Sequence, residues 1–382
     1  MNLPIHDLFR PAVLGTLEVP NRFVASAVHL GGASAKGTLP PLLAARWEAL
    51  AAGGAGTVIP GAAFVEPRGR FFPGQWNLGE DAREGDVQDL SRRIHRQGAR
   101  LVVQLAHGGF LGHPELRDGR TWGPSEGTAP TSPLPVQALE ERDLEDILDT
   151  FAASALRALR GGADGVQIHA AHGTLPMQFL SPRHNRRSDR FGGSPENRRL
   201  FLQSLVRRVR EALGPTLPLW VKLSFREEVP GGYDEPEGIA AALCCLDAGA
   251  DALELSSGSH YSLPPLRPTR VGIAAGSSEA PFAPFARELR RLRPHAPLIL
   301  TGGLRSLEVM ASLLQEGVCD AFGLGRPLLA EPDLVNRWRE DDARPAACIS
   351  CNACLKGSDE ELRDCPVMRD KTEVFWGAQD LD

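Results

Sequence analysis

Short apolar runs alternate with longer amphipathic segments along most of this chain. Runs of this length bounded by Gly, Pro or charged residues are typical of buried strands. We expect eight strands, at Arg22–Ala27, Gly56–Ala63, Arg100–Ala106, Gly165–Ala171, Pro218–Ser224, Ala252–Gly258, Pro297–Gly303 and Asp320–Arg326.

The segments between these runs carry apolar residues at helical spacing. We expect helices at Pro41–Ala52, Asp86–Gln97, Asp143–Arg160, Pro195–Leu213, Pro236–Ala248, Pro281–Leu292, Ser306–Gln315 and Pro332–Trp338. A strand followed by a helix, eight times over, predicts an α/β fold of the closed (β/α)₈ (TIM) barrel type. An open doubly wound sheet is the alternative, but it would normally carry Gly-x-Gly-x-x-Gly after its first strand, and that motif is not found there. We expect one barrel domain over residues 1–340 and a short cysteine-containing tail over 341–382.

Composition narrows the classes of function. The net charge of −6 argues against a nucleic-acid surface, which usually needs a basic face. The sequence has no apolar run of ~18 residues, so no membrane span is predicted. The N-terminus does not resemble a signal peptide, and we expect a cytoplasmic protein. Its predicted partner is a small-molecule substrate, and a homo-oligomer is compatible with the sequence.

Polar and glycine residues follow almost every predicted strand. The carboxyl ends of barrel strands form one face, where the active site of such a fold lies. The residues expected there include an amide, an ammonium, hydroxyls, imidazoles and glycine turns: Ser26, Gly61, Gln104, His169, His172, Lys222, Tyr261, Gly303, Gly325 and Arg326.

Two glycine turns follow the last two predicted strands. They are Thr301-Gly-Gly-Leu304 and Gly323-Leu-Gly-Arg326. Barrels often bind a phosphate at this place through backbone N–H groups, and an arginine adds a bidentate donor. The plainer alternative is that the glycines only make tight turns and Arg326 forms a surface ion pair. Two such turns on neighbouring strands favour phosphate binding.

His169 and His172 end the apolar run that begins at Gly165. Neutral imidazoles at a strand end can donate hydrogen bonds to a carbonyl or anionic oxygen. A long polar loop follows and closes at Ser194, a good N-cap for a helix with Pro195 in its first position.

These histidines are part of a set of ordered blocks. The blocks are His169-Ala-Ala-His172-Gly173, Phe179-Leu-Ser-Pro182, Phe191-Gly-Gly-Ser-Pro-Glu-Asn-Arg198, Pro20-Asn-Arg-Phe-Val24, Val102-Val-Gln-Leu-Ala-His-Gly-Gly109 and Gly323-Leu-Gly-Arg-Pro-Leu-Leu329. They resemble the signature of the old yellow enzyme family of FMN-dependent ene-reductases. The resemblance covers roughly residues 5 to 340, the whole predicted barrel.

The resemblance implies an FMN across the barrel mouth, reduced by NAD(P)H and passing hydride to an activated alkene. His169 and His172 would then bind the electron-withdrawing oxygen of the substrate, and a cation at Lys222 would stabilise reduced flavin. The implied cofactor contacts are Ser26 and Gly61 to the flavin ring, Gln104 to its pyrimidine side, Lys222 beside N1–C2, and Gly303, Gly325 and Arg326 to the phosphate.

The sequence departs from the family at the expected proton donor. The family usually has a tyrosine two residues after the second His or Asn, and this chain has Thr174, a poor acid. Tyr261, which follows the sixth predicted strand, is the predicted replacement, with His260 or a water as alternatives.

Four cysteines near the end have the spacing C-x₂-C-x₂-C-x₁₀-C, at Cys348, Cys351, Cys354 and Cys365. Such spacing suits an iron–sulfur cluster, or less well zinc. It resembles the cluster segment of dienoyl-CoA reductases and trimethylamine dehydrogenases, with the third cysteine one residue short. We favour free or loosely paired thiols, so no metal ligand is predicted. Two rival functions are an iron–sulfur flavoprotein dehydrogenase or reductase fed by a partner, and a non-catalytic flavin-binding barrel.

Overall fold

The structure is a computed structural model and describes residues 3–79, 84–113, 116, 118–356 and 361–368. Part of the predicted cysteine tail, 357–360 and 369–382, therefore lies outside the described residues. Eight parallel strands form a closed ring, because β10, the first strand of the sheet order, also pairs with β6, and a further short strand pairs with β6 outside the ring order. They are β3 (Phe23–Ala25), β4 (Thr57–Val58), β6 (Arg100–Ala106), β10 (Gly165–Ala170), β11 (Leu219–Ser224), β12 (Ala252–Ser256), β13 (Leu298–Thr301) and β14 (Ala321–Leu324). The predicted (β/α)₈ barrel is confirmed.

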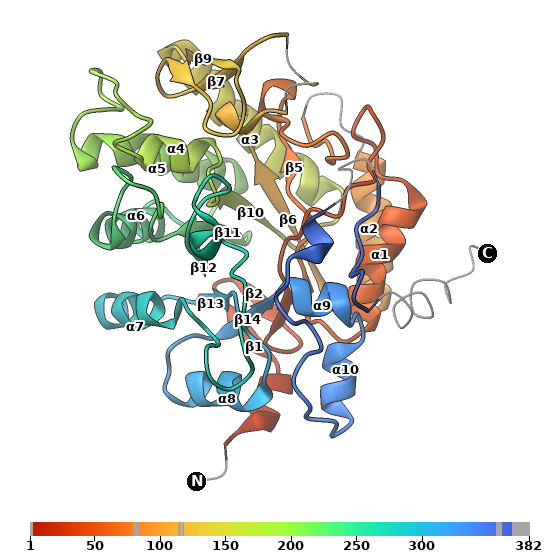
Figure 1. Cartoon of the computed structure of the whole chain (residues 1–382). Coiled ribbons are helices and arrows are strands. Elements are labelled where there is room, and N and C mark those ends of the chain that lie inside the picture. Colours follow the sequence, from red (N-terminus) through yellow and green to blue (C-terminus); the bar gives the residue numbers. More distant parts are fainter. Residues whose placement is uncertain (1–2, 80–83, 114–115, 117, 357–360, 369–382) are drawn as a thin grey trace.

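Helices surround this ring of strands (Figure 1). Eight of them match the expected ones to within two residues: α1 (Pro41–Ala52), α2 (Glu84–Arg96), α3 (Glu141–Arg160), α5 (Pro195–Leu213), α6 (Glu235–Asp247), α7 (Ala283–Leu292), α8 (Leu307–Gln315) and α10 (Leu334–Arg339). Local chemistry explains the agreement at α5, where the Asn197 N–H donates to Ser194 Oγ at 3.2 Å and Pro195 begins the helix.

The apolar core has two parts. The larger part fills the layer between strands and helices, with side chains such as Phe201 on α5 and Phe151 on α3 fully buried. The smaller part lies inside the barrel, where Trp220 is fully buried. There the antiparallel hairpin of β1 (Ala12–Leu14) and β2 (Leu17–Val19) packs Leu14, Leu17 and Val19 against inward residues of the strands. The hairpin therefore closes the N-terminal end of the barrel.

The two long loops contain structure that the sequence did not predict. The loop after β10 holds a short helix, α4 (Leu175–Leu180). The loop after β6 holds a three-stranded sheet of β7 (Thr121–Gly123), β9 (Pro135–Ala138) and β8 (Gly127–Thr128). Elements this short carry no readable hydrophobic period. The remaining short elements are β5 (Ala63–Phe64), α9 (Arg326–Ala330) and 3₁₀ turns at Ile5–Phe9, Pro67–Gly69, Gly109–Leu111, Pro264–Leu266 and Ala353–Leu355.

The described part of the tail packs on the barrel. Leu355 and Leu362 contact the larger core, and the Arg363 N–H donates to the Leu30 carbonyl at 2.7 Å. The tail, blue in Figure 1, runs beside α1 and α9. A domain boundary at residue 340 stays a prediction. Within the described residues, the structure shows no helix of sufficient length and apolarity to cross a bilayer.

Candidate active site

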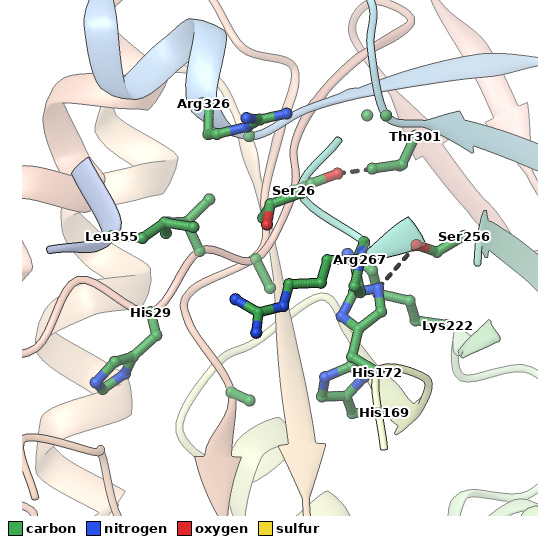
Figure 2. A pocket seen from close by; sticks show the side chains of 18 of the residues that line it. Ser26, His29, His169, His172, Lys222, Ser256, Arg267, Thr301, Arg326 and Leu355 are labelled. Carbon is green, nitrogen blue, oxygen red and sulfur yellow. Dashed lines mark hydrogen bonds between the residues drawn. The ribbon is translucent and has the colours of Figure 1, made fainter. Parts of the chain in front are cut away.

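A cavity lies at the carboxyl ends of the strands. It encloses about 1250 Å³, part of it continuous with solvent. Figure 2 shows side chains from several strands and loops converging on it. It brings together most of the residues predicted from sequence: Ser26, Gln104, His169, His172, Lys222, Gly303, Gly325 and Arg326. Gly61 and Tyr261 are not among the lining residues that the structure describes. Gly61 lies beneath the wall, where an added Cβ would come within 2.6 Å of the Val28 carbonyl oxygen.

A buried carboxylate organises the floor of the cavity. Glu254 on β12 is opposite Lys222 on β11 in the strand register, and its Oε1 lies 2.8 Å from Lys222 Nζ. Ser26 Oγ and Thr301 Oγ1 donate to the same oxygen at 2.7 and 2.8 Å. Burial by itself would raise the pKa of Glu254, but the Lys222 ammonium and these hydrogen bonds lower it. The floor thus holds a neutralised ion pair.

The other Glu254 oxygen connects the floor to the predicted flavin-binding amide. Gln167 Nε2 donates to Glu254 Oε2 at 2.9 Å, and Gln104 Nε2 donates to Gln167 Oε1 at 2.6 Å. Gln104 and Gln167 are register partners on β6 and β10, so both amides face the same way. This chain of bonds fixes which atoms of Gln104 face the cavity.

The turns after β13 and β14 have a backbone conformation that lets a ligand come close to the main chain. Gly302 and Gly303 have φ of +105° and +70°, a region that favours glycine. Any Cβ on Gly323 would collide with Thr301 Oγ1 and Ser26 Oγ. Beside the turns, Arg326 donates to the Arg270 carbonyl at 2.8 Å and to Asn352 Oδ1. A ligand phosphate can therefore approach backbone N–H groups with a guanidinium next to it.

The histidine pair stands at the other side of the cavity. The rings of His169 and His172 are 5.2 Å apart at 84°, and His169 is 6% exposed. His169 Nδ1 has no hydrogen-bond partner among the described residues, whereas His172 Nε2 lies 2.8 Å from Ser256 Oγ. Burial lowers the pKa of both rings well below the usual value, helped by the Lys222 charge. Both are neutral at pH 7, and His169 still needs a partner.

Neither Thr174, at the family's usual proton-donor position, nor Tyr261, the predicted replacement, is among the described residues that line the cavity. Thr174 is fully buried at the start of α4, and its hydroxyl donates to the carbonyls of His169 and Ala171 at 2.7 and 3.0 Å. The Tyr261 hydroxyl donates to Glu227 Oε1 at 2.9 Å. Both hydroxyls are thus engaged in holding the wall of the cavity together.

His260, the neighbour of Tyr261, lines the cavity instead. Its ring is 6.0 Å from that of His172 and nearly perpendicular to it. Burial, with the charges of Arg267 and Arg363, lowers the pKa of His260 to about 4. Neighbouring residues after a strand end can face opposite ways, which explains why His260 and not Tyr261 reaches the cavity.

Several lining or supporting residues were missed by sequence analysis. The signal for Glu254 was a charge between two leucines of a buried strand, opposite Lys222. Arg267 and Arg363 come from loops without any period, so the sequence offers no signal for them. The missed residues are Gln167, Glu254, Arg267, Thr301, Arg305 and Arg363.

Three of the tail cysteines, Cys348, Cys351 and Cys365, act electrostatically on the fourth, Cys354. The pKa of Cys354 is raised to about 11 by burial, against the Arg326 charge and with contributions from Cys348, Cys365 and Cys351. Within the described residues, no three His, Cys, Asp or Glu side chains are arranged to hold a metal ion. The iron–sulfur alternative is untested by this arrangement.

The family model for the NADH:flavin oxidoreductase / NADH oxidase family matches residues 7–344. The chain belongs to this family. The resemblance read from the sequence is thereby confirmed. The family uses FMN with NAD(P)H as reductant. The glycine turns and Arg326 of this family member would hold the phosphate of an FMN, and the unpartnered His169 Nδ1 would bind a polar ligand atom.

Known relatives cover much of this family member. An NADH oxidase of Thermoanaerobacter brockii is 31% identical over 92% of this chain and 54% of the relative. A 4,4'-dithiodibutanoate disulfide reductase of Rhodococcus erythropolis is 28% identical over 96% of this chain and 98% of its own length. The solved old yellow enzyme homologue of Zymomonas mobilis is 27% identical with a TM-score of 0.76, covering 90% of this chain and 95% of that one. The chain spans about half the length of the first curated relatives it matches.

Proposed function

We propose that this chain oxidises NAD(P)H through FMN and reduces an activated alkene or a related small acceptor. The proposal rests on one observation. His169 and His172 lie in the same cavity as Lys222 and as the two glycine turns that contain Gly303 and Gly325. The arrangement thus offers a hydrogen-bonding pair for an acceptor opposite a cradle for an anionic cofactor. Bound FMN would supply two-electron chemistry, taking hydride from NAD(P)H and giving it to the acceptor.

The residues on the cofactor side would bind and orient. Gly303, Gly325 and Arg326 would hold the phosphate, Gln104 and Ser26 the flavin ring, and Gly61 would support the wall beneath it. Lys222 would place positive charge beside the reduced ring, which stabilises its negative charge. Because Glu254 already neutralises Lys222, this stabilisation is smaller than an isolated ammonium would give.

The residues on the acceptor side would polarise the acceptor. His169 Nδ1 and the Nδ1 edge of His172 would donate hydrogen bonds to its carbonyl oxygen, drawing electron density from the carbon that receives hydride. Both rings stay neutral at pH 7 because burial lowers their pKa. A neutral donor suits this role, since it binds oxygen without a competing counter-ion.

The proton that completes the reduction would come from His260 in this proposal. His260 lines the cavity, whereas the Tyr261 hydroxyl is bonded to Glu227. With the pKa of His260 at about 4, its protonated fraction falls tenfold per pH unit above that value. The step that consumes the proton should therefore slow as the pH rises from 5 to 8.

The test separates the two half-reactions under anaerobic conditions. FMN-loaded protein is mixed with NADH or NADPH, and bleaching of the flavin is followed. Cyclohexenone or a dialkyl disulfide is then added, the latter because the Rhodococcus relative is named for a disulfide. His169→Ala should slow reoxidation by cyclohexenone about 10²-fold, as expected for loss of one donor to a developing oxyanion. Arg291→Ala, at an exposed pair with Glu288 on α7, is the control. If cyclohexenone reoxidises the His169→Ala protein as fast as it reoxidises the unmutated protein, the proposal is contradicted.

A second candidate is an iron–sulfur flavoprotein dehydrogenase or reductase. It is favoured by the spacing of Cys348, Cys351, Cys354 and Cys365 in the sequence and by the electrostatic effect of the other three cysteines and of Arg326 on Cys354. Protein purified without oxygen would then contain iron and acid-labile sulfide, and Cys354→Ser would lose both. Iron-free anaerobic protein with full activity would exclude it. A barrel that only binds flavin would show neither half-reaction.

A further inference from the structure

We propose that Glu254 is a positioning residue for the cofactor, and that its charge lowers the reduction potential of the flavin beside Lys222. This inference rests on the proposed function, in which FMN lies over the floor of the cavity. It goes beyond that function, because it assigns control of the potential to a residue that is not among the described lining residues of the cavity.

Glu254 is an ionised carboxylate inside the barrel. Its side chain is fully buried, and its Oε1 lies 2.8 Å from Lys222 Nζ. Burial alone would raise the pKa of Glu254, but the Lys222 ammonium and the hydrogen bonds from Ser26 and Thr301 lower it. A negative charge therefore stands directly behind the ammonium at pH 7.

The charge that a ligand meets at the floor is therefore the charge of a pair. Lys222 lines the cavity, and Glu254 supports it from behind. Reduction adds negative charge to a flavin, which an ammonium stabilises and a carboxylate opposes. Because charges in a buried site are poorly screened, both groups act on the ring together. Removing the Glu254 charge alone should make reduction easier, and removing the Lys222 charge alone should make it harder.

The same carboxylate fixes the direction of two hydroxyl groups. Ser26 Oγ and Thr301 Oγ1 donate to Glu254 Oε1 at 2.7 and 2.8 Å, and they lie 3.2 Å from each other (Figure 2). A hydroxyl has one proton to donate. Each hydroxyl can therefore only accept a hydrogen bond from a ligand in the cavity that both residues line. Gly323 leaves room for this arrangement, since a Cβ there would collide with both hydroxyl oxygens.

The other carboxylate oxygen fixes the Gln104 amide. Gln167 Nε2 donates to Glu254 Oε2 at 2.9 Å, and Gln104 Nε2 donates to Gln167 Oε1 at 2.6 Å. An ionised carboxylate only accepts, so the NH₂ group of Gln167 must face Glu254 and its carbonyl must face Gln104. Among the described residues, Gln104 thus keeps its carbonyl oxygen and one N–H for a ligand. The pyrimidine edge of a flavin, a carbonyl beside an N–H, is the complement of this amide.

The reduction potential of the bound flavin tests the charge directly. FMN-loaded Glu254→Gln and Lys222→Met proteins are compared with the unmutated protein by anaerobic reduction beside a reference dye. Glu254→Gln should raise the midpoint potential by about 30 mV or more, which for a two-electron couple is a tenfold change in the equilibrium constant. Lys222→Met should lower the potential. Glu254→Asp, which keeps the charge, should stay close to the unmutated protein.

Sulfite gives a second measurement that needs no NAD(P)H. It adds to oxidised flavin and leaves negative charge on the ring, so it responds to the same field. Its dissociation constant, from an absorbance titration, should fall about tenfold in Glu254→Gln and rise in Lys222→Met. Glu227→Gln is the matched control, because it removes another fully buried carboxylate, one that is bonded to Tyr261 and is not among the described lining residues. It should change neither measurement.

A purely structural role for Glu254 predicts a different result. If both single variants shift the potential in the same direction, or if Glu254→Gln leaves it unchanged, the proposal is overturned. Should Glu254→Gln fail to fold, Lys222→Met/Glu254→Gln leaves no unpaired buried charge at the floor and isolates the effect of Glu254. Its potential should lie above that of Lys222→Met, and an equal or lower value would also overturn the proposal.

The same proteins separate this inference from the proposed function. If the potentials shift as expected while neither cyclohexenone nor a dialkyl disulfide reoxidises the flavin, the proposed function fails and the role of Glu254 stands. If the acceptors are reduced but the potentials do not shift, the proposed function stands and the role of Glu254 fails.

Discussion

The floor of the cavity and its acceptor side both contain polar side chains, but they differ in how many of these side chains have hydrogen-bond partners. On the floor, Ser26, Gln104, Lys222 and Thr301 are joined through Glu254 and Gln167, so each has a partner. On the acceptor side, His169 Nδ1 lacks a partner among the described residues and Arg267 is exposed. The floor is organised before any ligand arrives, whereas the acceptor side is left for a ligand to complete.

This difference determines whether a mutation lowers folding stability or ligand binding. A satisfied buried network is expensive to break, because removing one member leaves another charged or polar group without a partner. A buried polar group without a partner lowers the stability of the free protein, and a ligand that bonds to the group restores this lost stability on binding. Mutations on the floor should therefore change folding, and mutations on the acceptor side should change binding and rate.

Lys222→Met should show the largest effect on the floor. It leaves the Glu254 carboxylate buried without its counter-ion, a change that costs about 3–5 kcal/mol. Urea unfolding of the apoprotein measures it. The double variant Lys222→Met/Glu254→Gln should regain most of the loss, and a double variant no more stable than the single one contradicts an ion pair at the floor.

Arg326→Ala tests the phosphate end. Loss of a charge-assisted hydrogen bond of about 1.5–3 kcal/mol should weaken FMN binding roughly 10- to 100-fold. Riboflavin, which has no phosphate, should bind both proteins alike in a fluorescence titration. Because Arg326 also donates to Asn352, Asn352→Ala separates loss of the tail contact from loss of the phosphate contact. Equal weakening for riboflavin would place Arg326 elsewhere in the site.

The histidines beside the cavity make stability depend on pH. The pKa values of His260 and His29 are lowered by burial to about 4 and about 3, below the 6.5 of an unfolded chain. Their contribution to stability is complete above pH 6.5 and is lost as the pH falls toward these values. The loss is well under about 1.4 kcal/mol per pH unit each, because His260 is exposed and His29 is half-buried, so that solvent screens both charges. Urea unfolding of the apoprotein at pH 7, 6 and 5 measures the slope. His260→Gln should reduce it, and an unchanged slope would show that His260 is not responsible.

Tyr261→Phe should have the smallest effect. The change removes one hydrogen bond to Glu227, worth about 1 kcal/mol of stability. If His260 delivers the proton, the rate of flavin reoxidation by cyclohexenone should change by less than about twofold, within a few tenths of a kcal/mol. A fall of 10²-fold or more would return the role to Tyr261 and show that the wall rearranges when the acceptor binds.

The fold was largely predictable because its signals are local. The apolar run Gly165–Ala170 is a strand buried on both faces, and Ser194 with Pro195 sets the start of α5. The sheet of β7, β8 and β9 was not predictable, since strands of two to four residues have no period to read.

The site was predictable where it sits on strand ends. Gln104, His169 and Lys222 follow from their positions in the barrel. Glu254 could have been found only by aligning its strand with that of Lys222. Arg267 and Arg363 depend on how a loop and the tail cross the mouth, and the direction of Tyr261 depends on Glu227; none of these is encoded in a local pattern.

The hairpin of β1 and β2 has a kinetic consequence. Leu14, Leu17 and Val19 fill the N-terminal end of the barrel. In the described structure, ligands can therefore enter and leave only through the opposite end, where the cavity lies. In the proposed function, oxidised NAD(P) would have to leave before the acceptor could reach His169 and His172, so each compound in excess would compete with the other. Double-reciprocal plots of the steady-state rate should then be parallel, and each substrate should inhibit competitively against the other. This is the pattern of a ping-pong mechanism in which both substrates use one site.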